Sequence, residues 1–238
     1  MLLLLALLVV AGAVLQGLVG FGQGLAIAPL AVAALGPGRG LTALTCMGLG
    51  LNLGLLLGEP AGERRLSLRL LVTAPLGVAV GTGAARVLPA APLEVATGVV
   101  AVLLASSLLL LQPRARPFPA LLPIAGGLAG CLQATTTLSG PPLVLALSVE
   151  GRSPGEVRSL LFSTFLVLGV SAMVGYLVVG LFSIQGGLLG LAAIPPALLG
   201  GWVGTQVARR FPTRRYRALL LVAVIGAGVA AILLSLLR

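Results

Sequence analysis

Long apolar runs follow one another along almost the whole chain, separated by short loops that contain arginine. Only 8% of the residues are charged and 58% are hydrophobic, a balance that soluble domains do not reach. Apolar runs of about 20 residues can cross the hydrocarbon core of a bilayer as α-helices. The sequence therefore predicts an all-α polytopic membrane protein without a separate soluble domain. The apolar start of the chain has no basic region, so we interpret it as part of the first span and not as a signal peptide.

The charged residues exclude several classes of function. All fifteen basic residues are arginine, and the sequence has no histidine and no aspartate. A net charge of +10 would indicate a nucleic-acid partner for a soluble protein, but here the arginines fall in short loops, where they orient membrane helices. Cys46 and Cys131 lie in apolar surroundings and are interpreted as packed residues. We expect no catalytic residue, no metal site, no cofactor and no nucleic-acid partner.

The chain contains an internal repeat. Residues 77–89 and 200–212 are identical at seven of thirteen positions, at an offset of 123 positions. Gln16 and Gln133, and the Pro-Gly pairs at 37 and 154, correspond at an offset of 117. We predict a first transmembrane repeat over 1–112, a basic, proline-rich cytoplasmic linker over 113–119, and a second repeat over 120–238.

Each half is predicted to contain two short apolar segments followed by three full spans. In the first half these segments cover 2–17 and 22–35, then 41–57, 68–87 and 93–111. In the second half they cover 120–134 and 141–149, then 157–181, 185–208 and 217–237. Whether the short segments cross the membrane or re-enter it stays open, so eight and ten crossings are both compatible with the sequence.

Loop charge predicts that the two halves run in opposite directions. If the basic loops are cytoplasmic, twelve arginines lie inside, and Arg39, Arg86 and Arg238 lie outside. The loop after residue 87 is nearly neutral, whereas its repeat counterpart after residue 208 is strongly basic. This pattern indicates an inverted-topology repeat with both termini outside, an architecture in which transporters bind substrate at the repeat interface near the midplane. A parallel repeat is the alternative.

The densest polar cluster lies at residues 130–142, where three consecutive threonines precede a Gly-Pro-Pro run. Proline is excluded from a continuing helix but is favourable in a first turn, so we predict a break near 135–140 and a new helix from Pro141. Broken backbone at membrane depth is tolerated where it lines a cavity, and the N-terminus of a helix favours an anion. The alternative is a packing kink in which the threonines bond to their own helix.

Residues 16–25 are the matching glycine-rich stretch of the first half, and inversion would bring the two breaks together from opposite membrane faces. We therefore predict a small-anion site formed by both breaks. Its predicted residues are Gly22, Gln23, Gly24, Gln133, Thr136, Thr137, Ser139 and Gly140. Arg39 and Arg158 could attract anions at opposite mouths, although such arginines are commonly topology anchors that snorkel to the interface.

At these residues the chain resembles the sulfite exporter TauE/SafE family of membrane proteins. The resemblance rests on the glycine-rich residues 17–24, on Pro29, and on Ser139-Gly-Pro-Pro-Leu followed by Arg158. It covers essentially the whole chain, but Thr-Thr-Thr and Gly-Pro-Pro stand where the commoner family pattern has Gly-Gly-Gly. The resemblance implies a plasma-membrane protein that moves sulfur-containing anions such as sulfite, sulfoacetate or thiosulfate.

Taken together, these patterns predict a multi-pass secondary transporter that exports small sulfur-containing oxyanions or organosulfonates across the plasma membrane. The five glutamates fall in loops or at helix ends, so the sequence predicts no buried carboxylate that could carry a proton, and the coupling ion stays open. The expected partners are the anion and the lipid bilayer, with a homo-oligomer left open. The alternative function is a non-transporting structural or assembly subunit.

Overall fold

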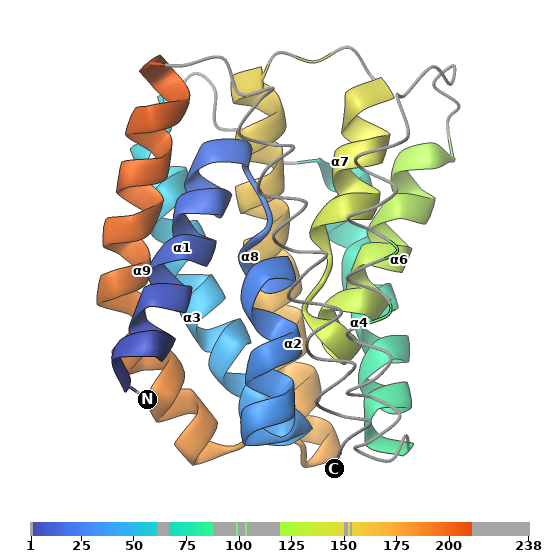
Figure 1. The fold of residues 1–238 in the computed structure, drawn as a ribbon. Coiled ribbons are helices and arrows are strands. Elements are labelled where there is room, and N and C mark those ends of the chain that lie inside the picture. Colours follow the sequence, from blue (N-terminus) through green and yellow to red (C-terminus); the bar gives the residue numbers. More distant parts are fainter. Residues whose placement is uncertain are drawn as a thin grey trace.

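A computed structural model of the protein describes residues 2–60, 67–87, 99, 103, 120–149, 152 and 154–210. Within this part of the chain every regular element is an α-helix (Figure 1). The helices are α1 (Leu2–Val19), α2 (Gln23–Leu35), α3 (Pro37–Gly58), α4 (Leu68–Val87), α6 (Leu121–Thr136), α7 (Gly140–Val149), α8 (Pro154–Val179) and α9 (Ile184–Arg210). The helices α3, α4, α8 and α9 are long and apolar enough to cross a membrane. The predicted all-α polytopic class is confirmed.

The helix boundaries agree closely with the predicted ones. The second break begins after Thr136, and α7 starts at Gly140, one residue before the predicted Pro141. Helices α3 and α8 start earlier than predicted, at Pro37 and Pro154, because proline in the first turn has no N–H that needs an intrahelical partner. The predicted linker 113–119 and the predicted span 217–237 lie outside the described residues, as does almost all of 93–111, so the domain boundaries stay predictions.

Large apolar side chains on the long outer helices point away from the bundle. On α4, Val72, Leu76 and Val80 are exposed at a spacing of four residues, so they form one stripe on the outer face. On α9, Leu199 and Trp202 are similarly exposed. An apolar surface of this kind is stable where the surrounding solvent is lipid.

Corresponding glycines of the two halves make corresponding contacts. A Cβ atom on Gly81 of α4 would collide with the carbonyl oxygen of Cys131 on α6, and a Cβ atom on Gly204 of α9 would collide with that of Val14 on α1. The glycines are 123 positions apart, and their partners are 117 apart, which are the two offsets of the sequence repeat. The fourth helix of each half therefore packs closely on the first helix of the other half.

The contacts also give the directions of the helices. Glu59 after the end of α3 pairs with Arg158 at the start of α8, and Gly38 at the start of α3 lies beside Leu181, just after α8, so these two helices are antiparallel. Helices α1, α3 and α9 run one way, whereas α4, α6 and α8 run the other way (Figure 1). Corresponding helices of the two halves thus have opposite directions, as an inverted repeat requires; a parallel repeat would have given them the same direction.

The close approach of α4 and α6 can be tested with two alanine substitutions one half-turn apart. Gly81→Ala places a methyl group against the Cys131 carbonyl, whereas a Cβ on Gly83 meets nothing within 4 Å. We expect Gly81→Ala to lower the stability by about 1–3 kcal/mol, the usual cost of overpacking, and Gly83→Ala to leave it unchanged or higher. Thermal unfolding of the detergent-solubilised variants measures both, and equal effects would contradict the packing described above.

Candidate functional site

The two helix breaks meet in the middle of the bundle. Helix α2 lies in the lower part and α7 in the upper part of the view in Figure 1, with their N-termini toward each other. Gly24 in the first turn of α2 packs on the backbone of Thr137, so closely that a Cβ atom would collide with the Thr137 carbonyl oxygen. Gly140 at the start of α7 likewise packs on the Phe21 side chain of the first break. The two breaks thus form one joint region of irregular backbone.

Both breaks begin with the same backbone geometry. Gly20 ends α1 in the left-handed region (φ 92°) and donates its N–H to the Gln16 carbonyl at 2.8 Å. Thr137 ends α6 in the same region (φ 59°) and donates its N–H to the Gln133 carbonyl at 3.1 Å. Glycine adopts this conformation without cost, but for a β-branched threonine it costs on the order of 1–3 kcal/mol. The second break therefore holds a strained residue beside the candidate site.

A cavity of about 50 Å³ lies between the two breaks and the middle parts of α3 and α8. Seven of the eight predicted site residues line it: Gly22, Gln23, Gly24, Gln133, Thr137, Ser139 and Gly140. Among the described residues, no charged side chain contributes to the lining. Any ligand here would be held by amide, hydroxyl and backbone groups.

Three polar side-chain atoms on the cavity wall have no hydrogen-bond partner in the described part of the protein. They are Nε2 of Gln23, Oγ1 of Thr45 and Oγ1 of Thr137, and all three are buried. A buried polar group without a partner costs about 1–3 kcal/mol, so such groups are expected to be satisfied by something that enters the cavity. Gln133 accepts a hydrogen bond from Ser139 Oγ through its Oε1 at 2.7 Å, which orients the amide and leaves its N–H groups for a ligand.

Thr136, the eighth predicted residue, does not line the cavity. Its hydroxyl donates to the Leu132 carbonyl at 2.8 Å, and the hydroxyl of Thr135 donates to the Cys131 carbonyl at 2.9 Å. Both bonds lie within α6, because at these two positions the helix still continues. For these two threonines the alternative interpretation, bonding to their own helix, describes the structure.

Three polar residues of the cavity wall were not among the predicted site residues: Gln16, Thr45 and Asn52. Gln16 Nε2 donates to Asn52 Oδ1 at 2.5 Å, and Asn52 Nδ2 donates to the Gly48 carbonyl at 2.7 Å. The repeat pairing of Gln16 with Gln133 could have identified Gln16, since both glutamines occupy equivalent positions on the cavity wall. Asn52 lies in the middle of a full span, and only the packing of α3 against the breaks brings it to the cavity.

The N-termini of α2 and α7 both contribute to the cavity wall. The first N–H groups of a helix have no intrahelical partner, and the macrodipole places roughly half a positive charge there. Pro141 and Pro142 have no N–H, so Gly140 and Leu143 are the only donors among the first four residues of α7. Two such N-termini directed at one cavity are equivalent to about one positive elementary charge, without any charged side chain.

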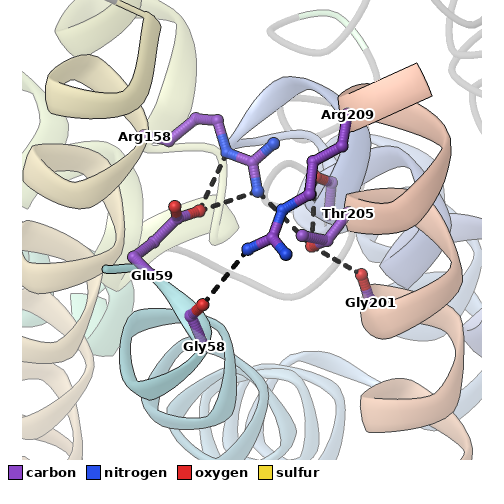
Figure 2. A network of polar contacts seen from close by, with 7 residues as sticks. Gly58, Glu59, Arg158, Gly201, Thr205 and Arg209 are labelled. Atoms are coloured by element: carbon purple, nitrogen blue, oxygen red, sulfur yellow. Dashed lines mark hydrogen bonds and ion pairs between the residues drawn. The ribbon is translucent and has the colours of Figure 1, made fainter. Parts of the chain in front are cut away.

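The two predicted anion-attracting arginines lie at opposite ends of the bundle. Arg39 is exposed near the start of α3. Arg158 is engaged: its Nη2 and Nε lie 2.8 and 3.1 Å from Oε1 of Glu59 (Figure 2). Glu59 is only 7% exposed, so the expectation of no buried carboxylate is wrong. Glu59 directly follows the end of α3, so its location at a helix end was predicted correctly. It is nevertheless buried, because Arg158 of α8 pairs with it and Arg209 of α9 bonds to the adjacent Gly58 carbonyl.

Comparison with known proteins gives one match. The sequence matches the family described as sulfite exporter TauE/SafE over residues 4–231, which is nearly the whole chain. No curated protein and no solved structure matches the chain. The family match includes both helix breaks and all residues of the cavity wall, and the protein therefore belongs to the sulfite exporter TauE/SafE family of membrane transporters.

Proposed function

We propose that the protein is a secondary transporter in the plasma membrane that exports small sulfur-containing oxyanions or organosulfonates, of the sulfite, thiosulfate or sulfoacetate type. The observation that carries the proposal is the set of three unsatisfied buried groups, on Gln23, Thr45 and Thr137, in a cavity faced by two helix N-termini. Family membership supports the class of solute. The substrate binds in the cavity, in contact with the breaks of both halves.

The electrostatics of the cavity favour an anion with one negative charge. The two N-termini together are equivalent to about one positive elementary charge, and no charged side chain of the described residues lines the cavity to add to it. Gln23, Gln133 and Thr137 offer amide and hydroxyl donors that replace part of the hydration shell. A dianion such as thiosulfate or sulfoacetate would leave its second charge uncompensated in a region of low dielectric constant, which is costly, so among these solutes the cavity favours hydrogensulfite, the singly charged form of sulfite.

The size of the cavity also fits a small oxyanion. One water needs roughly 10–15 Å³ of such space, so about 50 Å³ has room for about three to five atoms of that size. This corresponds to the sulfur and oxygen atoms of a sulfite or thiosulfate ion. A larger organosulfonate requires the cavity to widen during transport.

The arrangement of arginines supports the direction of transport. The start of α8, with Arg158, and the end of α9, with Arg209 and Arg210, lie at the upper end of the bundle in Figure 1. By the positive-inside rule we infer that this arginine-rich end faces the cytoplasm and that the start of α1 lies outside; the predicted span 217–237 would return the C-terminus to the same side. The inside-negative membrane potential then drives a monoanion outward by about 2.3 kcal/mol per 100 mV.

The transport activity is tested by flux of labelled sulfite, thiosulfate and a small organosulfonate in proteoliposomes with an imposed potential of either sign. We expect Thr137→Val and Gln23→Leu to weaken transport of the accepted anion about 10- to 100-fold, because each removes a hydrogen bond to a charged ligand. Thr135→Val is the matched control, since that hydroxyl bonds within α6. Normal flux in both site variants would refute the binding site but not the transporter class. Absence of flux in a well-folded preparation would favour the structural-subunit alternative.

The unsatisfied Thr137 hydroxyl predicts a separation of stability from binding. Thr137→Val removes a buried group that has no partner, so we expect thermal stability without ligand to stay the same or rise. Ser139→Ala removes the bond to Gln133 Oε1 and should lower stability by about 1 kcal/mol. Added sulfite should raise the unfolding temperature of wild type and not that of Thr137→Val. A clear loss of stability in Thr137→Val would mean that the hydroxyl has a structural role.

A further inference from the structure

A polar network joins the two halves at the arginine-rich end of the bundle (Figure 2). Arg158 of α8 pairs with Glu59 at the end of α3 and donates from Nη2 to Thr205 Oγ1 of α9 at 3.4 Å. The Thr205 hydroxyl in turn lies 3.5 Å from the carbonyl oxygen of Gly17 in α1. Helices α1 and α3 belong to the first half, and α8 and α9 belong to the second. The two halves cannot separate at this end without breaking the ion pair.

The ion pair lies next to the first helix break, whose neighbouring residues line the cavity. A Cβ atom on Gly20, the residue that ends α1, would lie 3.2 Å from Cγ of Arg158, so the arginine side chain packs on the first break. Gln16, one turn before Gly20, already lines the cavity. The Arg158 guanidinium also stands 5.8 Å from the centre of the Phe162 ring, within range of a cation–π interaction. Arg158 is therefore a charged side chain that packs on the first break, on the side of the arginine-rich end.

Toward the opposite end of the bundle, the position equivalent to Glu59 carries no charge. Tyr176 stands 117 positions after Glu59, which makes it the repeat equivalent of that residue. Its hydroxyl donates to the carbonyl oxygen of Ala134 at 3.0 Å, and Ala134 is the repeat equivalent of Gly17. Equivalent carbonyl groups are thus covered by a neutral tyrosine at one end and by the Arg158 network at the other. Because a tyrosine hydroxyl fills this role at the equivalent position among the described residues, packing alone does not require an ion pair there.

A second arginine of the described residues also approaches the end of α3. Arg209, one turn after Thr205 on α9, donates from Nη2 to the carbonyl of Gly58 at 3.3 Å, next to Glu59. Two guanidinium groups therefore converge on the end of α3, where the Glu59 carboxylate accepts from Arg158 (Figure 2). Both ion-pair contacts of Arg158 go to the same oxygen of Glu59, so the parallel two-oxygen geometry that guanidinium groups favour is not used. Arg158 therefore does not hold the Glu59 carboxylate in the geometry in which a guanidinium group binds an oxyanion best.

We propose that Arg158 is a second anion-binding site, at the cytoplasmic mouth of the pathway, and that Glu59 occupies it as a tethered anion while this end is closed. An arriving oxyanion replaces the carboxylate on Arg158, which releases the contact between the halves and opens the way to the cavity. Planar guanidinium groups suit the oxygens of sulfite and sulfonate groups. This inference rests on the proposed function, because the anion that opens the gate is the anion that is transported.

Kinetics distinguish this exchange from a purely structural ion pair. Glu59→Gln and Arg158→Gln both abolish the pair, so a structural role predicts that they shift the KM for sulfite in the same direction. If sulfite replaces Glu59 on Arg158, the two substitutions should shift KM in opposite directions when sulfite is added at the arginine-rich side. We expect Glu59→Gln to lower KM about tenfold, because the competitor is gone, and Arg158→Gln to raise it at least about tenfold. Arg210→Gln, an exposed arginine at the same end, controls for the loss of surface charge.

A second measurement follows the gate without transport. In a background lacking Cys46 and Cys131, a cysteine introduced at Leu44 on the cavity wall is labelled with a membrane-impermeant thiol reagent in vesicles of both orientations. Both Glu59→Gln and Arg158→Gln should accelerate labelling several-fold from the arginine-rich side only. Unchanged labelling in both variants overturns the gate, and KM shifts of equal sign overturn the exchange while leaving the transporter assignment intact. No sulfite flux in wild type would overturn both proposals together.

Discussion

A bilayer core offers no water to the peptide groups of a spanning chain, and the whole structure depends on how this constraint is met. The long helices satisfy their own backbone, but the two breaks leave carbonyl and N–H groups without intrahelical partners. The structure buries the breaks against each other and covers the carbonyls of Gly17 and Ala134 with side chains from neighbouring helices. The free N–H groups at the starts of α2 and α7 are left facing one cavity. The same constraint that makes the breaks costly thereby concentrates hydrogen-bond donors at a single place.

The two halves use one backbone plan with different side chains, and the differences are complementary. Gln23 begins α2 where the second half has Gly140, and Ser139 stands where the first half has Gly22. Each polar side chain thus corresponds to a glycine in the other half, so both fit around one small cavity without crowding. The same principle gives the ends of the bundle different chemistry, because Tyr176 and Glu59 occupy equivalent positions. The backbone of the two halves is therefore related by symmetry, whereas the side chains at the two ends of the bundle differ in charge.

Much of the fold could be predicted because it depends on local rules. Gly-Pro-Pro and the glycine-rich stretch interrupt helices wherever they occur, so both breaks were predicted within a few residues. The repeat offsets and loop charges predicted the opposite directions of the halves. The site was predicted less completely. Thr136 was expected at the cavity, but α6 continues through it and its hydroxyl returns to Leu132. Gln16 and Asn52 could not be assigned as partners, because they lie on separate helices with no local pattern connecting them.

The sequence by itself determined the membrane class, the broken helices, the duplicated and inverted plan, and the family, because composition, glycine and proline positions, and charge in loops act through the bilayer and the backbone. Only the tertiary structure decided which polar groups meet. Glu59 and Arg158 are 99 positions apart, and their pairing depends on the packing of α3 against α8. The same packing turned a glutamate at a helix end into a buried carboxylate, and left Gln23 and Thr137 without partners. A side chain's partners depend on the position and rotation of neighbouring helices, and no local stretch of sequence encodes these.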